Sequence, residues 1–346
     1  STGGTLRAVT GRGTDLVAVG YGLVATSGDG VAWTGTSPGG PLWMHDVTVG
    51  GPGFVAVGGS ENDGWSAAWT SQDGITWSKH PFGPTSGSWM MTEMMAVTTG
   101  GPGFVAVGKG PYEGPDGGYV FGASRAWVWT SPDGFTWTRA PHIPDLSIAV
   151  TLRDVATYGD TLVAVGSGTE GAAAVFTSTD GITWQQLPHD DLFNPWAMSS
   201  VAQYGDKLVA AGGDSVWIGT PRDQGESTSE TVPDPPTTTA AVETTTETIA
   251  STPSTVAPTP ETTMPSATSV LRFRVDELDG EWWPGSDVAA LPGGGFVVVT
   301  DGNGVFWTED GEVWADADPD RMVSAHFQFS DYSEGMTQQP ERLTVV

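Results

Sequence analysis

A nearly all-apolar run of five residues recurs along the chain and dominates its hydrophobic pattern. A run that is apolar at every position predicts a β-strand buried on both faces, because alternate side chains point to opposite sides. Each run follows a shorter strand-like segment and a Gly-bearing turn, as residues 6–9 and 45–47 illustrate. The six runs are residues 16–20, 54–58, 104–108, 162–166, 208–212 and 296–300.

A second recurring segment reads Trp-Thr-Ser-x-Asp-Gly-x-Thr-Trp or close to it. It occurs at residues 69–77, 129–137 and 176–184, with looser copies at 25–33 and 307–314. We predict a β-hairpin whose two short strands are joined at Asp-Gly by a two-residue type I′ turn. Gly adopts positive φ freely and Asp tolerates it, so the pair suits that turn. The two arms would be the third and fourth strands of each repeating unit.

Four strands per unit, repeated about every 40 to 50 residues, predict a β-propeller, in which small sheets are arranged radially. We therefore expect an all-β chain of four-stranded blades with six recognisable units. Residues 341–346 resemble the second-strand runs, which predicts a partial seventh unit at the end. The 49 Gly and 25 Pro residues fit the many tight turns of such a fold.

A low-complexity segment interrupts the repeat. Residues 226–269 consist mostly of Thr, Pro, Ser, Ala and Glu, with no aromatic side chain. Such a composition buries too little apolar surface to offset the entropy of ordering, and its Pro content predicts an extended spacer. We expect blades 1 to 5 in residues 1–225, this linker in 226–269, and the remaining blade or blades with closing strands in 270–346. Residues 270–275 would lead into the sixth unit, within one interrupted ring.

The Asp-Gly segment resembles the Asp box of sialidase-type (BNR) propellers, whose motif is Ser-x-Asp-x-Gly-x-Thr-Trp. Ser71, Asp73, Gly74, Thr76 and Trp77 match this motif with one residue fewer between Asp and Gly. The segments 131–137 and 178–184 match it in the same way. The resemblance implies that the box builds the blade, on the turn between third and fourth strands and far from the ligand face.

The catalytic set of sialidases is incomplete in this chain. The resemblance implies an arginine triad that grips a carboxylate, and Arg7 and Arg153 occupy equivalent places at the starts of first strands. The other units have His45, Met95, Ser199 and Ser286 there. The first-strand residues Asp46, Asp154 and Asp287 are better explained by bonds to backbone or by lining the centre than by catalysis.

Composition narrows the classes of partner. The chain has 41 Asp+Glu against 13 Lys+Arg, a net charge of −28, so it repels nucleic acid and anionic lipid surfaces. No apolar run is long enough for a transmembrane helix, and there is no Cys. The five His residues lack metal-binding spacing, and residues 316–320 fit a solvated turn better than a calcium loop. We expect no metal and no cofactor.

Candidate binding residues lie where the repeat is broken. The longest connection between second and third strands is Lys109 to Arg125, and long loops on rigid scaffolds commonly carry recognition. On the same face, connections between blades carry Trp43, Trp89 and Trp196. An equally good explanation is that Trp89 and the neighbouring Met run fill the gap between blades 2 and 3. The candidates are Arg7, His45, Trp89, Glu93, Tyr112, Tyr119, Phe121, Arg125 and Arg153.

These observations favour a non-catalytic binding or scaffolding propeller, secreted or displayed on a bacterial cell surface. The expected partner is a protein or glycan at the cell envelope, and the oligomeric state is left open. The alternatives are a sialidase-like glycoside hydrolase and a propeller-type assembly factor. Architecture alone does not decide among them, because one fold hosts many functions.

Overall fold

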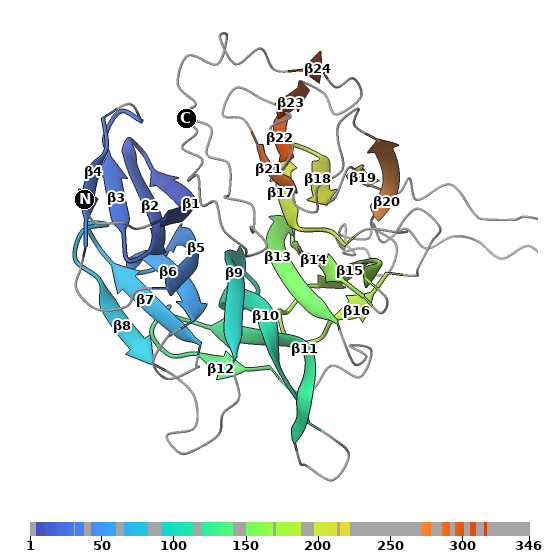
Figure 1. The fold of residues 1–346 in the computed structure, drawn as a ribbon, viewed down its shortest axis with the longest axis horizontal. Coiled ribbons are helices and arrows are strands. Elements are labelled where there is room, and N and C mark those ends of the chain that lie inside the picture. Colours follow the sequence, from blue (N-terminus) through green and yellow to red (C-terminus); the bar gives the residue numbers. More distant parts are fainter. Residues whose placement is uncertain are drawn as a thin grey trace, which may run out of the picture.

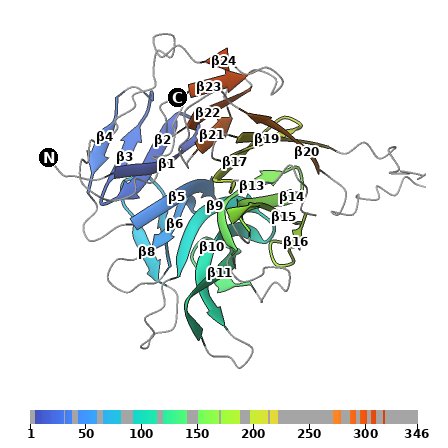
Figure 2. The same cartoon turned by 45° about the vertical axis from the view of Figure 1, so that its right-hand side comes forward.

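The protein is described by a computed structural model, shown in two views in Figures 1 and 2. It describes residues 5–30, 32–37, 43–59, 66–81, 92–113, 119–140, 150–168, 171–187, 197–212, 215–221, 271–277, 286–290, 295–300, 305–308 and 315–316. The linker at 226–269, Trp89 and the partial seventh unit lie outside these residues. None of the helical structure within them is long and apolar enough to cross a membrane.

The chain is a β-propeller, and the described residues form six antiparallel blades of four strands each. Blades 1 and 2 are joined into one eight-stranded sheet, because Tyr21 pairs with Trp43. The strands of blades 1 to 3 are β1 (Thr5–Arg12), β2 (Asp15–Tyr21), β3 (Val24–Ser27), β4 (Thr34–Thr36), β5 (Trp43–Gly50), β6 (Gly53–Gly59), β7 (Ala67–Ser71), β8 (Ser78–Pro81), β9 (Glu93–Gly100), β10 (Gly103–Glu113), β11 (Tyr119–Ser131) and β12 (Thr138–Arg139).

Blades 4 to 6 repeat this order. Their strands are β13 (Thr151–Tyr158), β14 (Thr161–Ser167), β15 (Ala173–Ser178), β16 (Gln185–Gln186), β17 (Ser200–Tyr204), β18 (Lys207–Gly212), β19 (Ser215–Pro221), β20 (Leu271–Glu277), β21 (Ser286–Ala290), β22 (Phe296–Thr300), β23 (Val305–Thr308) and β24 (Ala315–Asp316). The blades follow one another around a common centre, and the first strands of neighbouring blades lie side by side (Figure 1).

The apolar second strands are buried between blades, as predicted. In β6, Phe54 and Ala56 join the core between blades 1 and 2, whereas Val55 and Val57 join the core between blades 2 and 3. All four are fully buried. Fully burying a Val or Phe side chain stabilises by roughly 1.5–3 kcal/mol, so one strand holds three blades together. This double burial explains why the run is apolar at every position.

The predicted two-residue type I′ turn is wrong. In blade 2 the last paired residues are Thr70 and Ser78, so the chain makes a wider loop between them. The Gly74 N–H donates to Ser71 Oγ at 2.8 Å, and the Trp77 indole N–H donates to Gly74 O at 3.0 Å. Side chains therefore satisfy the backbone that a tight hairpin would have paired.

Asp73 accepts two further hydrogen bonds within this turn. Its Oδ1 accepts the backbone N–H groups of Ile75 at 2.9 Å and Thr76 at 2.8 Å. The bond from Thr76, followed by that from Ile75, lowers the pKa of Asp73 to about 2, since both favour the ionised carboxylate. The same pattern recurs at Asp133 and Asp180 in blades 3 and 4.

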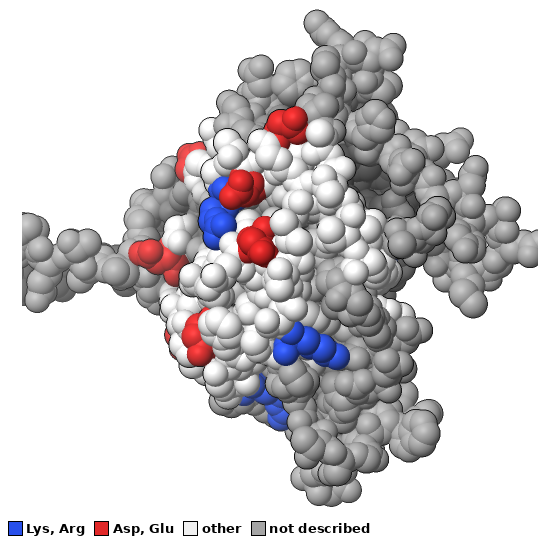
Figure 3. Space-filling model, turned by 90° about the vertical axis from the view of Figure 1, so that its left-hand side faces the viewer, with Lys and Arg blue, Asp and Glu red and all other residues white. Residues whose placement is uncertain are grey.

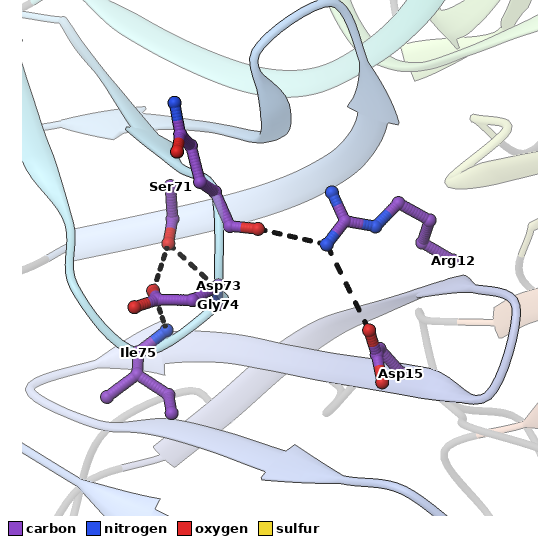
Figure 4. A network of polar contacts seen from close by, with 7 residues as sticks. Arg12, Asp15, Ser71, Asp73, Gly74 and Ile75 are labelled. Carbon is purple, nitrogen blue, oxygen red and sulfur yellow. Dashed lines mark hydrogen bonds and ion pairs between the residues drawn. The ribbon is translucent and has the colours of Figure 1, made fainter.

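These turns also join neighbouring blades. Figure 4 shows Arg12, at the end of β1, donating to the backbone O of Gln72 at 2.9 Å in the turn of blade 2. The turn glycine of blade 3, Gly134, has φ +78°, and an added Cβ would lie 2.9 Å from Val55 on β6. Gly181 in blade 4 stands in the same relation to Val105 on β10, at 2.7 Å. Each turn thus packs on the second strand of the preceding blade.

The first-strand aspartates form hydrogen bonds between neighbouring blades. Asp46 accepts the N–H of Val47 through Oδ1 and that of Val97, in blade 3, through Oδ2, both at 2.8 Å. Asp154 makes the same two kinds of bond to blades 4 and 5. Both side chains are buried. They hold backbone donors, as the sequence favoured, while the side chain of Asp287 lies outside the described residues.

Blade 5 is closed by a strand from beyond the linker. β20 pairs with β19 from Ser215 opposite Glu277 to Pro221 opposite Leu271. The segment predicted to lead into the sixth unit is instead the fourth strand of the fifth blade. The linker therefore joins the third and fourth strands of one blade, at the position of the Asp-Gly turn in blades 1 to 4.

Candidate binding site at the first-strand ends

In blades 1 to 4, a β-bulge places one side chain at the start of the first strand. The pairing of first and second strands skips one residue in each of blades 1 to 4. A bulge redirects a side chain and commonly occurs beside functional sites. The skipped residues are Arg7, His45, Met95 and Arg153, which confirms that these positions are equivalent.

Two of the bulge residues meet around Tyr21, the last residue of β2. The guanidinium carbon of Arg7 lies 4.2 Å from the centre of the Tyr21 ring. The rings of Trp43 and His45 have their centres 5.2 Å and 5.7 Å from that of Tyr21. Trp43 opens β5 and is 36% exposed, whereas His45 is buried. An exposed indole thus borders a buried polar group.

His45 bridges blades 2 and 3. Its Nδ1 lies 2.8 Å from the backbone O of Met94. Because a carbonyl oxygen only accepts hydrogen bonds, Nδ1 carries the proton, and the Nε2 of a neutral ring is a bare acceptor. Nε2 lies 3.3 Å from Glu93 Oε1, which is an ion pair only if the ring is protonated. In the neutral ring, Nε2 is buried without a hydrogen bond.

Burial sets the protonation of this ring. The burial of His45 lowers its pKa, and the nearby carboxylate of Glu93 opposes that effect without reversing it. Arg7 and Lys109 lower the pKa further. Burial likewise raises the pKa of Tyr21, so its phenol is neutral. At neutral pH the imidazole is therefore neutral, and its acceptor Nε2 faces a second acceptor, Oε1 of Glu93.

Glu93 is held from the solvent side by Lys109. Its Oε2 lies 2.9 Å from the Lys109 Nζ, and the two side chains are 27% and 41% exposed. An ion pair this open to solvent contributes about 0–1 kcal/mol. The ion pair with Lys109 therefore holds the Glu93 side chain only weakly in its place against His45. We call the set of contacting side chains the His45 cluster, and its members are Arg7, Tyr21, Trp43, His45, Glu93 and Lys109.

The structure brings together three of the predicted candidates, Arg7, His45 and Glu93. Arg153 occupies the equivalent bulge of blade 4 and is exposed, but the contacts that define the cluster do not include it. The predicted loop from Lys109 to Arg125 is largely a β-hairpin arm, because β10 extends to Glu113 and β11 begins at Tyr119. The arm projects from blade 3 in Figure 1.

The arm holds the other candidates. The guanidinium carbon of Arg125, which is buried, lies 5.9 Å from the ring centre of half-buried Tyr112. Tyr119 and Phe121 belong to β11, and their side chains lie outside the described residues, as does Trp89. Within the described part of the chain, no three His, Asp or Glu side chains converge to hold a metal ion.

Sequence reasoning missed Tyr21 and the role of Lys109. Both follow the apolar run of a second strand, where the pattern resembles the start of a loop. Since second strands run antiparallel to first strands, their ends lie beside the bulges. A search for polar and aromatic residues just after each apolar run would have found them.

No protein-family model matches the chain, and no curated protein is similar to it in sequence. Among solved structures, "YCF48 bound to D1 peptide" matches with a TM-score of 0.50 and 12% identity over 94% of this chain and 84% of that one. The SapL1 lectin with alpha methyl fucoside matches with a TM-score of 0.40 and 14% identity over 91% and 95%. A thermostable family-43 glycoside hydrolase matches at 0.38 and 11% over 63% and 84%. The first of these likenesses shows the propeller fold.

Proposed function

We propose that this protein is a non-catalytic binding module, secreted or displayed on a bacterial cell surface, whose ligand is a protein or glycan of the cell envelope. The observation that carries the proposal is the His45 cluster. It gathers charged and aromatic side chains from three blades around a buried imidazole nitrogen that lacks a partner. A fold that needed only packing at this point would have apolar residues there.

The charge of the cluster supports a specific site. In a chain with net charge −28, the cluster contains two cationic side chains, Arg7 and Lys109, and one carboxylate, Glu93. By contrast, on the flank of blades 1 and 2 most of the described surface is uncharged, and one basic group there lies directly beside acidic groups (Figure 3). The cluster therefore differs from an ordinary solvated surface.

A glycoside hydrolase is the alternative from another class. Glycosidases in general need two carboxylates that face each other across the sugar. The contacts that define the cluster include one, Glu93, and it is paired with Lys109 at 2.9 Å. Release of the fluorophore from any of a panel of fluorogenic glycosides, lost on Glu93→Gln, would favour the hydrolase over the binding module.

An assembly factor is the alternative within the binding class. YCF48, which shares the fold, is described as bound to a peptide. The β10–β11 arm supports this alternative, because a two-stranded projection with Tyr112 on it suits contact with another protein. Co-purification with a stable multi-subunit complex, lost when Tyr112, Tyr119 and Phe121 are all changed to Ala, would favour it.

We further propose that the Asp-Gly turns are shortened Asp boxes. Support comes from the recurring bonds of Ser, Asp, Gly and Trp in blades 1 to 4, which use the same atoms each time. In this proposal the boxes build blades and take no part in binding. They lie at the opposite end of the sheets from the His45 cluster.

A pull-down from bacterial cell-envelope extract tests the binding function. The baits are the full chain, a Trp43→Ala/His45→Asn double variant, and Phe135→Ala as the control. Phe135 is 47% exposed in the turn of blade 3, at the far end of the sheets. We expect material that the full chain and the control retain and the double variant loses. Identical profiles from all three baits would remove the cluster from the function.

A further inference from the structure

The His45 cluster has two adjacent acceptors and no donor between them. Nε2 of His45 and Oε1 of Glu93 lie 3.3 Å apart, and neither carries a proton when the ring is neutral. Two lone pairs at this distance repel each other. The side chain of His45 is 4% exposed, so water has little access to it. A buried polar atom left unpaired in this way costs about 1–3 kcal/mol.

A hydrogen-bond donor beside Tyr21 is also unpaired. Arg7 Nε is buried without a hydrogen-bond acceptor, while the guanidinium carbon lies over the Tyr21 ring. The cluster thus combines acceptors that need protons with a donor that needs a lone pair. Hydroxyl groups meet both needs, because each one donates one hydrogen bond and accepts others.

The charges around His45 decide between ligand classes. A cationic ligand would have donors, but it would enter beside Arg7 and Lys109, which repel it. An anionic ligand would be attracted by both, yet it brings no proton for His45 or Glu93. A neutral diol has two adjacent donors for two adjacent acceptors and oxygen atoms for the cations.

One member of the cluster offers an exposed aromatic surface. Trp43 is 36% exposed, and its ring is tilted by 42° to that of Tyr21. An indole face buries an apolar face of a ligand without needing a hydrogen-bond partner. A pyranose ring has such a face, formed by its C–H groups, and carries vicinal hydroxyls at its edge.

We infer, on the basis of the proposed binding function, that the ligand group is a neutral sugar residue of an envelope glycan. One hydroxyl of a vicinal diol donates to His45 Nε2, its neighbour donates to Glu93, and the ring lies on Trp43. Because Glu93 covers Nε2, its side chain moves aside as the sugar enters. Its exposed ion pair with Lys109 opposes that movement by little.

Titration of the full chain with methyl glycosides of neutral hexoses tests this inference. We expect at least one glycoside to bind with a Kd on the order of 1 mM. Isothermal titration calorimetry and saturation-transfer NMR measure this binding. Its deoxy analogues that lack either hydroxyl of one vicinal pair should bind about tenfold more weakly, as the loss of a buried hydrogen bond implies. Equal binding of every deoxy analogue would contradict the diol.

Two variants and one control locate the site. His45→Asn keeps a donor for the Met94 carbonyl and removes the Nε2 acceptor, so we expect about tenfold weaker binding. Trp43→Ala should abolish measurable binding, while Phe135→Ala should leave it unchanged. The unfolding temperature of each variant is measured as well, which distinguishes loss of the site from loss of the fold. Loss of binding in Phe135→Ala alone would place the sugar elsewhere.

The pH dependence separates a neutral from an anionic ligand. The groups facing His45 are Glu93, Arg7 and Lys109 from neighbouring strands, together with the neutral Tyr21 ring. As the pH falls through the pKa of His45, which lies below the usual value of about 6.5, Nε2 gains a proton that it donates to Glu93. Sugar binding should therefore weaken, whereas binding of a carboxylate ligand should strengthen.

Methyl glucuronoside and a short acidic peptide serve as the competing probes. If either binds and no neutral glycoside does up to about 50 mM, the sugar inference is overturned while the binding function stands. If the envelope pull-down is also unchanged by the Trp43→Ala/His45→Asn double variant, the proposed function fails as well. Binding of a neutral glycoside that needs both His45 and Trp43 supports both.

Discussion

The buried aspartates of the first strands show how one residue joins two blades. Asp46 uses one carboxylate oxygen for its own strand and the other for Val97 in the next blade. A carboxylate is suited to this place because it accepts at both oxygens and has no donor to satisfy. The same sequence feature that suggests a catalytic acid thus has a structural role in holding adjacent blades in register.

Replacement of Asp46 tests that role. Asp46→Ala leaves two buried backbone N–H groups without acceptors, and we expect a loss of about 3 kcal/mol in the free energy of unfolding. Asp46→Asn keeps one carbonyl oxygen as an acceptor, so its loss should be smaller. Urea unfolding, monitored by tryptophan fluorescence, measures the loss in both variants.

Asp15→Ala is the control, because its side chain is 65% exposed and makes only a long contact with Arg12 at 3.9 Å. We expect its effect to stay within about 0.5 kcal/mol. If Asp46→Ala were as mild as this control, the bonds between blades 2 and 3 would contribute little to stability.

The Asp-Gly turns are elements in which local sequence and tertiary contact act together. Gly134 needs its hydrogen side chain for two separate reasons. Its φ of +78° disfavours a Cβ, and the Val55 side chain of the preceding blade lies 2.9 Å from where that atom would be. The turn therefore depends on a neighbour more than fifty residues away, and an isolated hairpin peptide lacks that contact.

A matched pair of glycines separates the two effects. Gly159, in the turn between β13 and β14, has φ +57° with nothing within 4 Å of an added Cβ. Gly159→Ala should lose about 1 kcal/mol from strain alone. Gly134→Ala adds overpacking against Val55, and we expect a total loss of about 2–4 kcal/mol. Equal losses in urea unfolding would mean that the turn moves away from β6 without cost.

The propeller fold could be predicted from the sequence because its second strands are buried on both faces, which leaves an unmistakable apolar run. The turn geometry could not, because Asp-Gly suits a tight hairpin equally well. The wider loop is shown by the last strand pair, Thr70 with Ser78, and by the bonds from Ile75 and Thr76 to Asp73. The pairing of β20 with β19 could not be predicted either. The linker separates the two strands in the sequence, and the pattern of β20 fits the start of the next unit equally well.

The candidate site was predictable only in part, for a similar reason. Arg7, His45 and Glu93 stand at repeated positions before a first-strand core, so the register of the repeat marks them. Tyr21 and Lys109 become part of the site only through the antiparallel pairing of neighbouring strands. Nothing local in the sequence shows that His45 Nε2 faces a carboxylate.

At the scale of the whole molecule, the fifth blade holds together two parts of the chain that the linker separates. β19 and β20 share seven pairs of facing residues. Beyond this sheet, Val209 and Ile218 of blade 5 pack with Val288 and Val298 of blade 6 in a common core. The part of the chain beyond the linker is therefore attached by the pairing of β20 with β19 and by the apolar burial of blade 6, as well as by the covalent linker.

Cutting the linker should leave the molecule assembled. We expect a chain with a specific protease site inserted at about residue 250 to stay together after cleavage, because burial of each core valine stabilises the contact by roughly 1.5 kcal/mol or more. The measurement is size-exclusion chromatography after complete cleavage, with denaturing gels of the peak. Separate elution of the C-terminal fragment would show that β20 and blade 6 are held only by the linker. Because the linker leaves blade 5 at the end opposite to the His45 cluster, cleavage should also leave ligand binding unchanged.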